Sequence, residues 1–345
     1  MAYSPIDKPN TNFNPVLYTG NGTTQSITGV NFQPDFTWIK DRDSTAVHYL
    51  FNAVSGATKF TNSDQTYGEQ TNTQSLKSFD TDGFTLGTMT GANNNTNNFV
   101  SWNWKAGGTA SSNTDGTISS TVSANTTSGF SIVKYTGTGA NATVGHGLNA
   151  VPKIVFYKNL VNGSENWFVY SSKVGATKYL QLNTTVAETT SAGYFNNTDP
   201  TSSLLNVGTA NGTNQNTNSI IAYCFADVKG FSKFGSYTGN GSTDGTFIYT
   251  GFKPAFVICK ASSTTGDWLT ADIKRLPINV MNGSLAANLS NAESYFGGNN
   301  IDFLSNGFKL RTTGGVYNSS GATYIYMAFA ENPLVASNYV PTTAR

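Results

Sequence analysis

The stretch NFVSWNWK at residues 98–105 predicts a β-strand with two different faces, and the pattern returns as SIIAYCFA at 219–226 and YIYMAFAE at 324–331. Successive side chains of a strand point to opposite sides of its sheet. One side of these strands is large and apolar at the six positions that we expect in the core of the repeats: Trp102, Trp104, Tyr223, Phe225, Met327 and Phe329. Such a face predicts a sheet that packs against other apolar residues.

Each of these strands closes a repeat that also has a recognisable opening. The openings are YTGNG at 18–22, YTGTG at 135–139 and YTGNG at 237–241, which we interpret as hairpin turns. Short strands between Gly, Asn and Asp turns fill each interval, and about 100 residues with such strands are typical of a β-sandwich. We therefore predict an all-β chain of three tandem jelly-roll-like β-sandwich domains.

The domain boundaries follow from these repeats and from one polar stretch. Residues 109–128 consist largely of Ser, Thr, Gly and Asn, which predicts an extended linker. Because no such stretch separates the second and third repeats, we expect those two to pack closely. The predicted parts are an N-terminal arm at 1–12, repeat 1 at 13–108, the linker at 109–128, repeat 2 at 129–229, repeat 3 at 230–334 and a C-terminal tail at 335–345.

The chain carries little charge, which excludes several functions. Its 345 residues include 20 basic and 19 acidic side chains, so 11% are charged and the net charge is +1, against about 25% charged residues in a typical soluble domain. Nucleic-acid binding needs clustered Lys and Arg, so we expect no nucleic-acid partner. No apolar run of about 18 residues exists, so we expect no membrane insertion. The N-terminus lacks the apolar core of a signal peptide, which predicts synthesis in a cytoplasm.

The sequence offers little catalytic or metal-binding chemistry. His48 and His146 stand outside any nucleophile motif, and two cysteines, Cys224 and Cys259, are too few for a zinc site and are predicted to be buried thiols. The DTDG segment at 80–83 fits a hairpin turn better than a calcium loop. No carboxylate pair of the kind a glycosidase needs recurs in the repeats, although a triad assembled from distant residues stays open. We expect a non-enzymatic protein with no catalytic residue, metal or cofactor.

Two tryptophans are the candidate ligand contacts. Trp167 follows the polar loop NGSEN at 162–166, and Trp268 follows STTGD at 263–267, which places both at loop edges. Sugar rings stack on flat aromatic faces, so these side chains predict contact with a glycan or receptor. Packing in a core or an interface is the alternative for both.

Several long segments occur together in this chain: YTGNGTTQSITGVNFQPDFTWIK at 18–40, SFDTDGFTLG at 78–87, SWNWKAGG at 101–108, YCFADVKGFSKFGSYTGNG at 223–241 and YIYMAFAENP at 324–333. Their combination resembles a family of tailed-bacteriophage proteins, of the type found in marine phages, that comprises tail-fibre-like and other virion structural proteins. The resemblance covers nearly the whole chain, and the ending LVASNYVPTTAR at 334–345 departs from it.

The resemblance implies a location in the virion and a structural role, first as a tail fibre or tail-associated appendage in assembly and host attachment. The alternative is a capsid decoration or head-fibre protein that stabilises the shell, and a weaker one is a glycan-binding or glycan-degrading appendage. The implied partners are copies of the chain itself, with a trimer favoured because such assemblies have cyclic symmetry, other tail or capsid proteins, and a host glycan or outer-membrane protein. Serial sandwiches predict a rod.

Overall fold

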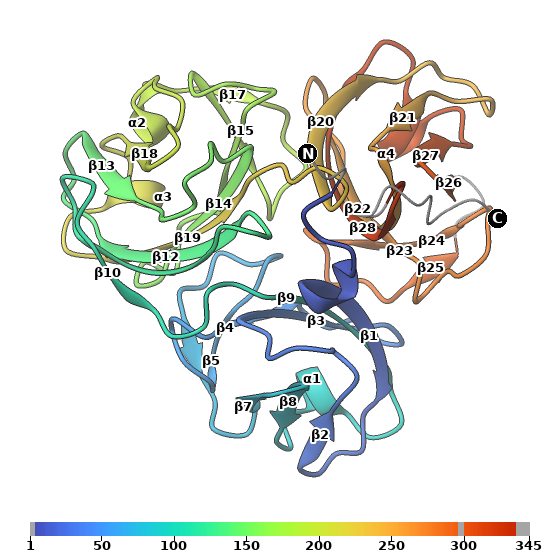
Figure 1. Ribbon diagram of the computed structural model, residues 1–345, viewed down its shortest axis with the longest axis horizontal. Coiled ribbons are helices and arrows are strands. Elements are labelled where there is room, and N and C mark those ends of the chain that lie inside the picture. Colours follow the sequence, from blue (N-terminus) through green and yellow to red (C-terminus); the bar gives the residue numbers. More distant parts are fainter. Residues whose placement is uncertain (1–3, 296–299, 336–345) are drawn as a thin grey trace.

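The computed structural model describes residues 4–295 and 300–335, and this part of the chain is all-β, with 43% strand and 6% helix (Figure 1). The predicted all-β class is therefore confirmed. The strands form three large sheets and three small ones, and each successive section of the chain supplies one of each kind. Most of the predicted C-terminal tail lies outside the described residues.

The first section forms a large sheet with strand order β1-β9-β3-β4-β5-β6 and a small sheet with order β2-β8-β7. Strands β7 and β8 are joined by a hairpin in which Asp80 pairs with Gly83, as the DTDG segment predicts. The elements are η1 (Pro9–Thr11), β1 (Phe13–Thr19), β2 (Gln25–Ile27), β3 (Phe36–Asp41), β4 (Tyr49–Asn52), β5 (Lys59–Thr61), β6 (Gln70–Thr71), β7 (Leu76–Asp80), β8 (Gly83–Leu86), α1 (Thr90–Asn93) and β9 (Asn98–Trp104).

The second section forms a large sheet with order β10-β11-β12-β19-β14-β15-β16-β17 and a small sheet of β13 and β18. Its elements are β10 (Ser111–Asn113), β11 (Ser120–Asn125), β12 (Phe130–Thr136), β13 (Ala142–Gly145), β14 (Ile154–Asn159), β15 (Phe168–Ser171), β16 (Lys178–Gln181), β17 (Thr189–Thr190), α2 (Ala192–Phe195), β18 (Leu204–Val207), α3 (Asn211–Asn214) and β19 (Ser219–Phe225).

The polar stretch at 109–128 is part of this second sheet rather than a free linker. Strand β11 pairs antiparallel with β12, from Ser120 opposite Tyr135 to Asn125 opposite Phe130, and β10 pairs with β11. Strand pairing joins backbone groups, so a run of Ser, Thr and Asn extends a sheet edge without an apolar side-chain pattern.

The third section has the large sheet β20-β28-β22-β23-β24-β25 and the small sheet β21-β27-β26. The elements are β20 (Ser232–Thr238), β21 (Phe247–Tyr249), β22 (Phe252–Ala261), β23 (Trp268–Asp272), β24 (Gly283–Ala286), β25 (Ser294–Tyr295), β26 (Ile301–Leu304), β27 (Gly307–Leu310), α4 (Gly315–Asn318) and β28 (Thr323–Pro333).

In each large sheet the closing strand is central. β9 lies between β1 and β3, β19 between β12 and β14, and β28 between β20 and β22. The glycine-rich openings are therefore not hairpins, because β1 pairs with β9 while β2 pairs with β8. A central strand has neighbours on both edges, which suits the most apolar segment of each repeat.

The three aromatic faces meet at the centre of the molecule. The rings of Trp104, Phe225 and Phe329 contact one another, with centroids 6.3 Å apart for Trp104–Phe225, 5.7 Å for Trp104–Phe329 and 6.1 Å for Phe225–Phe329. They belong to one buried apolar cluster that draws on all three repeats and includes Ile6 of the N-terminal arm. The repeats are therefore arranged around a common centre (Figure 1), and the expected rod is not what this chain forms.

Candidate functional site

The interfaces between the repeats are built in the same way three times, and they form a closed ring. At each interface a backbone N–H of one repeat donates to a carbonyl of the next, at 2.8 Å in all three cases. The pairs are Glu69 N with Leu160 O, Glu188 N with Ser262 O, and Glu293 N with Arg42 O. Repeat 1 thus contacts repeat 2, repeat 2 contacts repeat 3, and repeat 3 returns to repeat 1.

The structure corrects the placement of the two candidate ligand contacts. Trp167 and Trp268 are 0% and 2% exposed, so neither presents a ring face to a sugar. The indole N–H of Trp167 donates to Asn62 O of repeat 1 at 2.8 Å, and that of Trp268 donates to Gln181 O of repeat 2 at 2.8 Å. Both side chains hold neighbouring repeats together, and the loop sequences before them gave no sign of these partners.

At the interface between repeats 3 and 1, His48 has the role that the two tryptophans have at the other interfaces. Its Nδ1 accepts the indole N–H of Trp38 at 2.8 Å, and its Nε2 lies 3.0 Å from Ala286 O and 3.2 Å from Leu289 O of repeat 3. A carbonyl only accepts, so Nε2 carries the proton and the ring is neutral. Burial lowers the pKa of His48 to about 3, so this imidazole is a structural link and is not poised for proton transfer at neutral pH.

The second histidine and the two cysteines are buried as well. The Nε2 of His146 lies 3.2 Å from Thr201 O, its Nδ1 accepts from Leu148 N at 3.3 Å, and burial lowers its pKa. Cys224 and Cys259 are buried free thiols, as predicted, and burial raises the pKa of each to about 12. Both thiols therefore stay protonated, which makes them weak nucleophiles.

Each repeat has a buried lysine six residues after a proline, which is Pro34, Pro152 or Pro254. Lys158 Nζ donates to Thr66 O of repeat 1 at 2.7 Å, and Lys260 Nζ donates to Thr185 O of repeat 2 at 3.0 Å. Lys40 instead donates to Asp41 O of its own repeat at 2.6 Å. Burial lowers the pKa of all three lysines to about 8.

The interface between repeats 3 and 1 contains a buried ionic network. Arg275 lies between two carboxylates, with its Nε 2.5 Å from Asp272 Oδ2 and its Nη1 2.7 Å from Glu293 Oε1. Arg42 pairs with the other oxygen of Glu293 at 2.6 Å. Burial opposes the charge of Arg275, but the two carboxylates outweigh this effect and raise its pKa. Each charged group of this network has an ionic partner, so the network has a structural role rather than a catalytic one.

A buried asparagine in each repeat fixes the YTGNG or YTGTG loop, and sequence reasoning missed all three. In repeat 1, Asn93 Nδ2 donates to Thr23 O at 2.6 Å and to Gly87 O at 2.8 Å, while Asn21 N donates to Asn93 Oδ1 at 2.9 Å. Asn214 and Asn318 make the corresponding bonds in repeats 2 and 3. A Cβ at Gly20 would lie 2.2 Å from Asn94 O, which explains why this loop requires a glycine.

A signal for these asparagines does exist in the sequence. Each precedes the central aromatic residue of its closing strand by the same interval, since 104 − 93 = 225 − 214 = 329 − 318 = 11. The loop tyrosine completes the unit, because Tyr18 OH donates to Ala92 O at 2.7 Å and Tyr237 OH donates to Tyr317 O at 2.8 Å. In each repeat the glycine-rich loop, its tyrosine and the buried asparagine therefore form one hydrogen-bonded unit, which we call the clasp.

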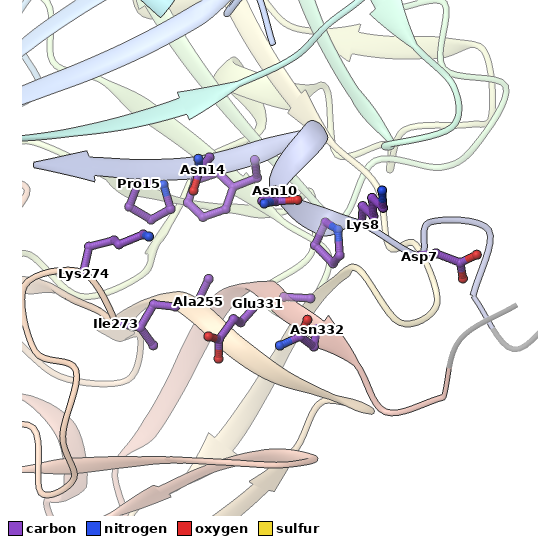
Figure 2. A pocket seen from close by; sticks show the side chains of 13 residues that line it. Asp7, Lys8, Asn10, Asn14, Pro15, Ala255, Ile273, Lys274, Glu331 and Asn332 are labelled. Carbon is purple, nitrogen blue, oxygen red and sulfur yellow. The ribbon is translucent and has the colours of Figure 1, made fainter. Parts of the chain in front are cut away.

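A pocket of about 500 Å³ lies between the start of repeat 1 and the edge of repeat 3 (Figure 2). Asp7, Lys8 and Asn10 line it from the N-terminal arm, and Lys274 and Glu331 line it from repeat 3. Glu331 also pairs with Lys253 at 2.6 Å. Because acidic and basic side chains both line this pocket, it suits a polar segment of another protein better than a small apolar ligand.

Within residues 4–295 and 300–335, no group of three or more His, Cys, Asp or Glu side chains lies close enough to hold a metal ion. Over the same residues, the helices are all too short or too polar to cross a bilayer. The six predicted core residues all lie in the central apolar cluster that the three repeats share.

Comparison with known protein families identifies a match over most of the chain. The model of a family described as a domain of unknown function (DUF7483) matches residues 8–333, which includes all three repeats. No curated protein and no solved structure matches the chain.

Proposed function

The chain belongs to the DUF7483 family, and we propose that it is a non-enzymatic structural protein of a bacteriophage virion, first a tail fibre or tail-associated appendage that acts in assembly and host attachment. The resemblance of its long segments to tailed-phage proteins supports the virion setting. The molecular architecture supports the structural role, and it does so in three steps.

The first step is the build of each repeat, which we propose is a jelly-roll-like β-sandwich domain. In repeat 1 a buried cluster joins Ile39 and Phe51 of the large sheet to Phe84 and Leu86 of the small one. Corresponding clusters lie in repeats 2 and 3. An apolar layer between two sheets is what defines a sandwich.

The second step is the closed ring of interfaces, which is the observation that carries the proposal. The same backbone contact of 2.8 Å recurs at every junction, and the central aromatic residues of all three repeats share one core. A ring of this kind resists the separation of any one repeat, because that repeat would leave two interfaces at once. A chain whose three repeats form a closed ring suits a particle component that must keep its shape outside a cell.

The third step is symmetry. One chain presents three similar units around a centre, so it matches a support with threefold symmetry without needing a second copy. A tail-fibre trimer offers such a support, and so does a capsid lattice. Because the pseudo-threefold arrangement fits both supports, we keep a second candidate, a capsid decoration or head-fibre protein.

Fractionated particles test the proposal. An antibody against the purified chain would be used on blots of separated heads and tails from a purified phage whose genome encodes it, with mass spectrometry of the same fractions. Signal in the tail fraction at low copy number supports the appendage. Signal in the head fraction, at a copy number comparable with the capsid subunit, supports decoration, and absence from purified particles overturns both.

A further inference from the structure

The outer face of the small sheet in repeat 3 carries two exposed aromatic side chains. Strand β21 pairs with β27, with Phe247 opposite Lys309 and Tyr249 opposite Gly307 (Figure 1, upper right). Phe247 is 42% exposed and Tyr249 is 56% exposed, while Ile248 between them is buried. Alternate residues of a strand share a face, so both rings point to solvent on the same side of the sheet.

The equivalent positions in the other two repeats are small or polar. The register aligns the strands on one buried pair, which is Ile27 with Phe84 in repeat 1, Val144 with Leu205 in repeat 2, and Ile248 with Phe308 in repeat 3. The flanking residues are Ser26 and Thr28 in repeat 1, Thr143 and Gly145 in repeat 2, and Phe247 and Tyr249 in repeat 3. The fold does not require aromatic residues there, so another role accounts for them.

Charged side chains of both signs lie on strand β27 beside Phe247 and on the segments next to it. Lys309, the cross-strand partner of Phe247, pairs with the exposed Asp244 at 2.5 Å. Arg311 lies 3.8 Å from the same carboxylate and 2.5 Å from Asp302. Two cations and two carboxylates give no net charge, and they supply hydrogen-bond donors and acceptors beside the aromatic rings.

The size of this face selects its occupant. Two aromatic side chains of about 150–250 Å² each, roughly half exposed, offer on the order of 200 Å², whereas a stable protein interface covers about 800 Å² on each partner. A second copy of the chain would therefore find too little area. A sugar ring matches the area, because one face of it is apolar and its hydroxyl groups both donate and accept hydrogen bonds.

We propose that Phe247 and Tyr249, with Lys309 and Asp244 beside them, form a binding platform for an uncharged sugar residue of a surface glycan. The proposal rests on the function proposed above, in which the glycan belongs to the surface of the host. It places attachment on repeat 3 alone, which leaves the small sheets of the other two repeats free to serve assembly.

A glycan array with immobilised neutral and acidic polysaccharides, probed with the purified full chain, tests the platform. The variant Phe247→Ser/Tyr249→Thr installs the residues of repeat 1, and we expect it to lose binding to neutral glycans by at least about tenfold. The control Tyr67→Ser removes a side chain that is similarly exposed, at 54%, in repeat 1 and should bind as the wild type does. The single variant Tyr249→Thr serves if the double variant melts early.

Three outcomes would overturn the platform: no binding of the wild type to any array member at micromolar concentration, equal binding by the double variant, or self-association of the wild type that the double variant loses. None of them affects the detection of the chain in particle fractions, so the failure of the platform and the failure of the virion assignment are separate results.

Discussion

Trp102 of repeat 1 donates its indole N–H to Asp272 of repeat 3 at 3.0 Å. The same carboxylate oxygen receives Arg275 Nε at 2.5 Å, and all three side chains are buried. Asp272 thus joins a residue of the central aromatic row to the ionic network of the neighbouring repeat. Apolar and ionic parts of this interface are therefore coupled through one carboxylate.

Replacing Asp272 by Ala should be among the most destabilising single changes in the chain. The change leaves Arg275 buried with only one of its two carboxylates and removes the acceptor of the Trp102 N–H, so we expect a loss of about 3–5 kcal/mol in the free energy of unfolding. Urea denaturation followed by fluorescence measures it. The exposed Asp115→Ala is the control and should stay within about 0.5 kcal/mol. Equal stability of the two variants would contradict the network's role.

The three rings in contact at the centre of the molecule, Trp104, Phe225 and Phe329, give a prediction that separates packing from hydrogen bonding. Trp104→Ala should lower the free energy of unfolding by about 3–5 kcal/mol, since it opens a cavity where three repeats meet. The indole N–H of Trp104 has no acceptor among the described residues, so Trp104→Phe should lose less than half as much. A thermal melt of both variants decides the point, and a Phe variant as unstable as the Ala variant would mean that the N–H is needed.

The buried asparagines of the clasps should contribute strongly to the stability of the folded chain. Asn214→Ala removes the acceptor for Thr138 N and the donor to Ala140 O and Gly208 O. We expect a loss of at least about 1–3 kcal/mol, because buried backbone groups are left without partners. Asn95→Ala, at an exposed position in repeat 1, should leave the denaturation midpoint unchanged. If both variants melt alike, the loop is held by other contacts.

The alternation in NFVSWNWK was enough to predict the central aromatic residues, but it did not reveal what covers them. An apolar face has the same pattern whether it packs on its own small sheet or on another repeat. The opposite faces of the closing strands are buried as well, as Ser101 and Cys224 show, so small residues there mark contact with a neighbouring layer. Trp167 and the asparagines were misjudged or missed because the partners that bury them are far away in the chain.

The segment 109–128 offers a direct test of this difference. Its composition predicts a protease-sensitive linker, whereas β10 and β11 are hydrogen-bonded into the second sheet. We expect brief digestion with a nonspecific protease to spare residues 120–125, because paired strands do not fit a protease cleft without local unfolding. Mass spectrometry of the fragments locates the cuts. Preferential cleavage within β11 would restore the linker interpretation.

The neutral state of His48 predicts how stability depends on pH. Burial lowers its pKa to about 3 in the folded chain, while the unfolded chain titrates near 6.5. Below pH 6.5 the unfolded state therefore binds a proton that the folded state refuses, so stability falls as the pH drops from 6.5 towards 3, by up to about 5 kcal/mol.

Urea midpoints of the wild type and of His48→Gln across pH 3–8 measure this contribution. The glutamine amide can still donate to Ala286 O, but it does not titrate between pH 3 and 8. We therefore expect the variant to be the less stable protein at pH 7 but to lose less stability on acidification. The difference between the two curves should shrink steadily below pH 6.5. A constant difference over that interval would show that the ring is protonated alike in both states, and the neutral link between repeats 1 and 3 would have to be abandoned.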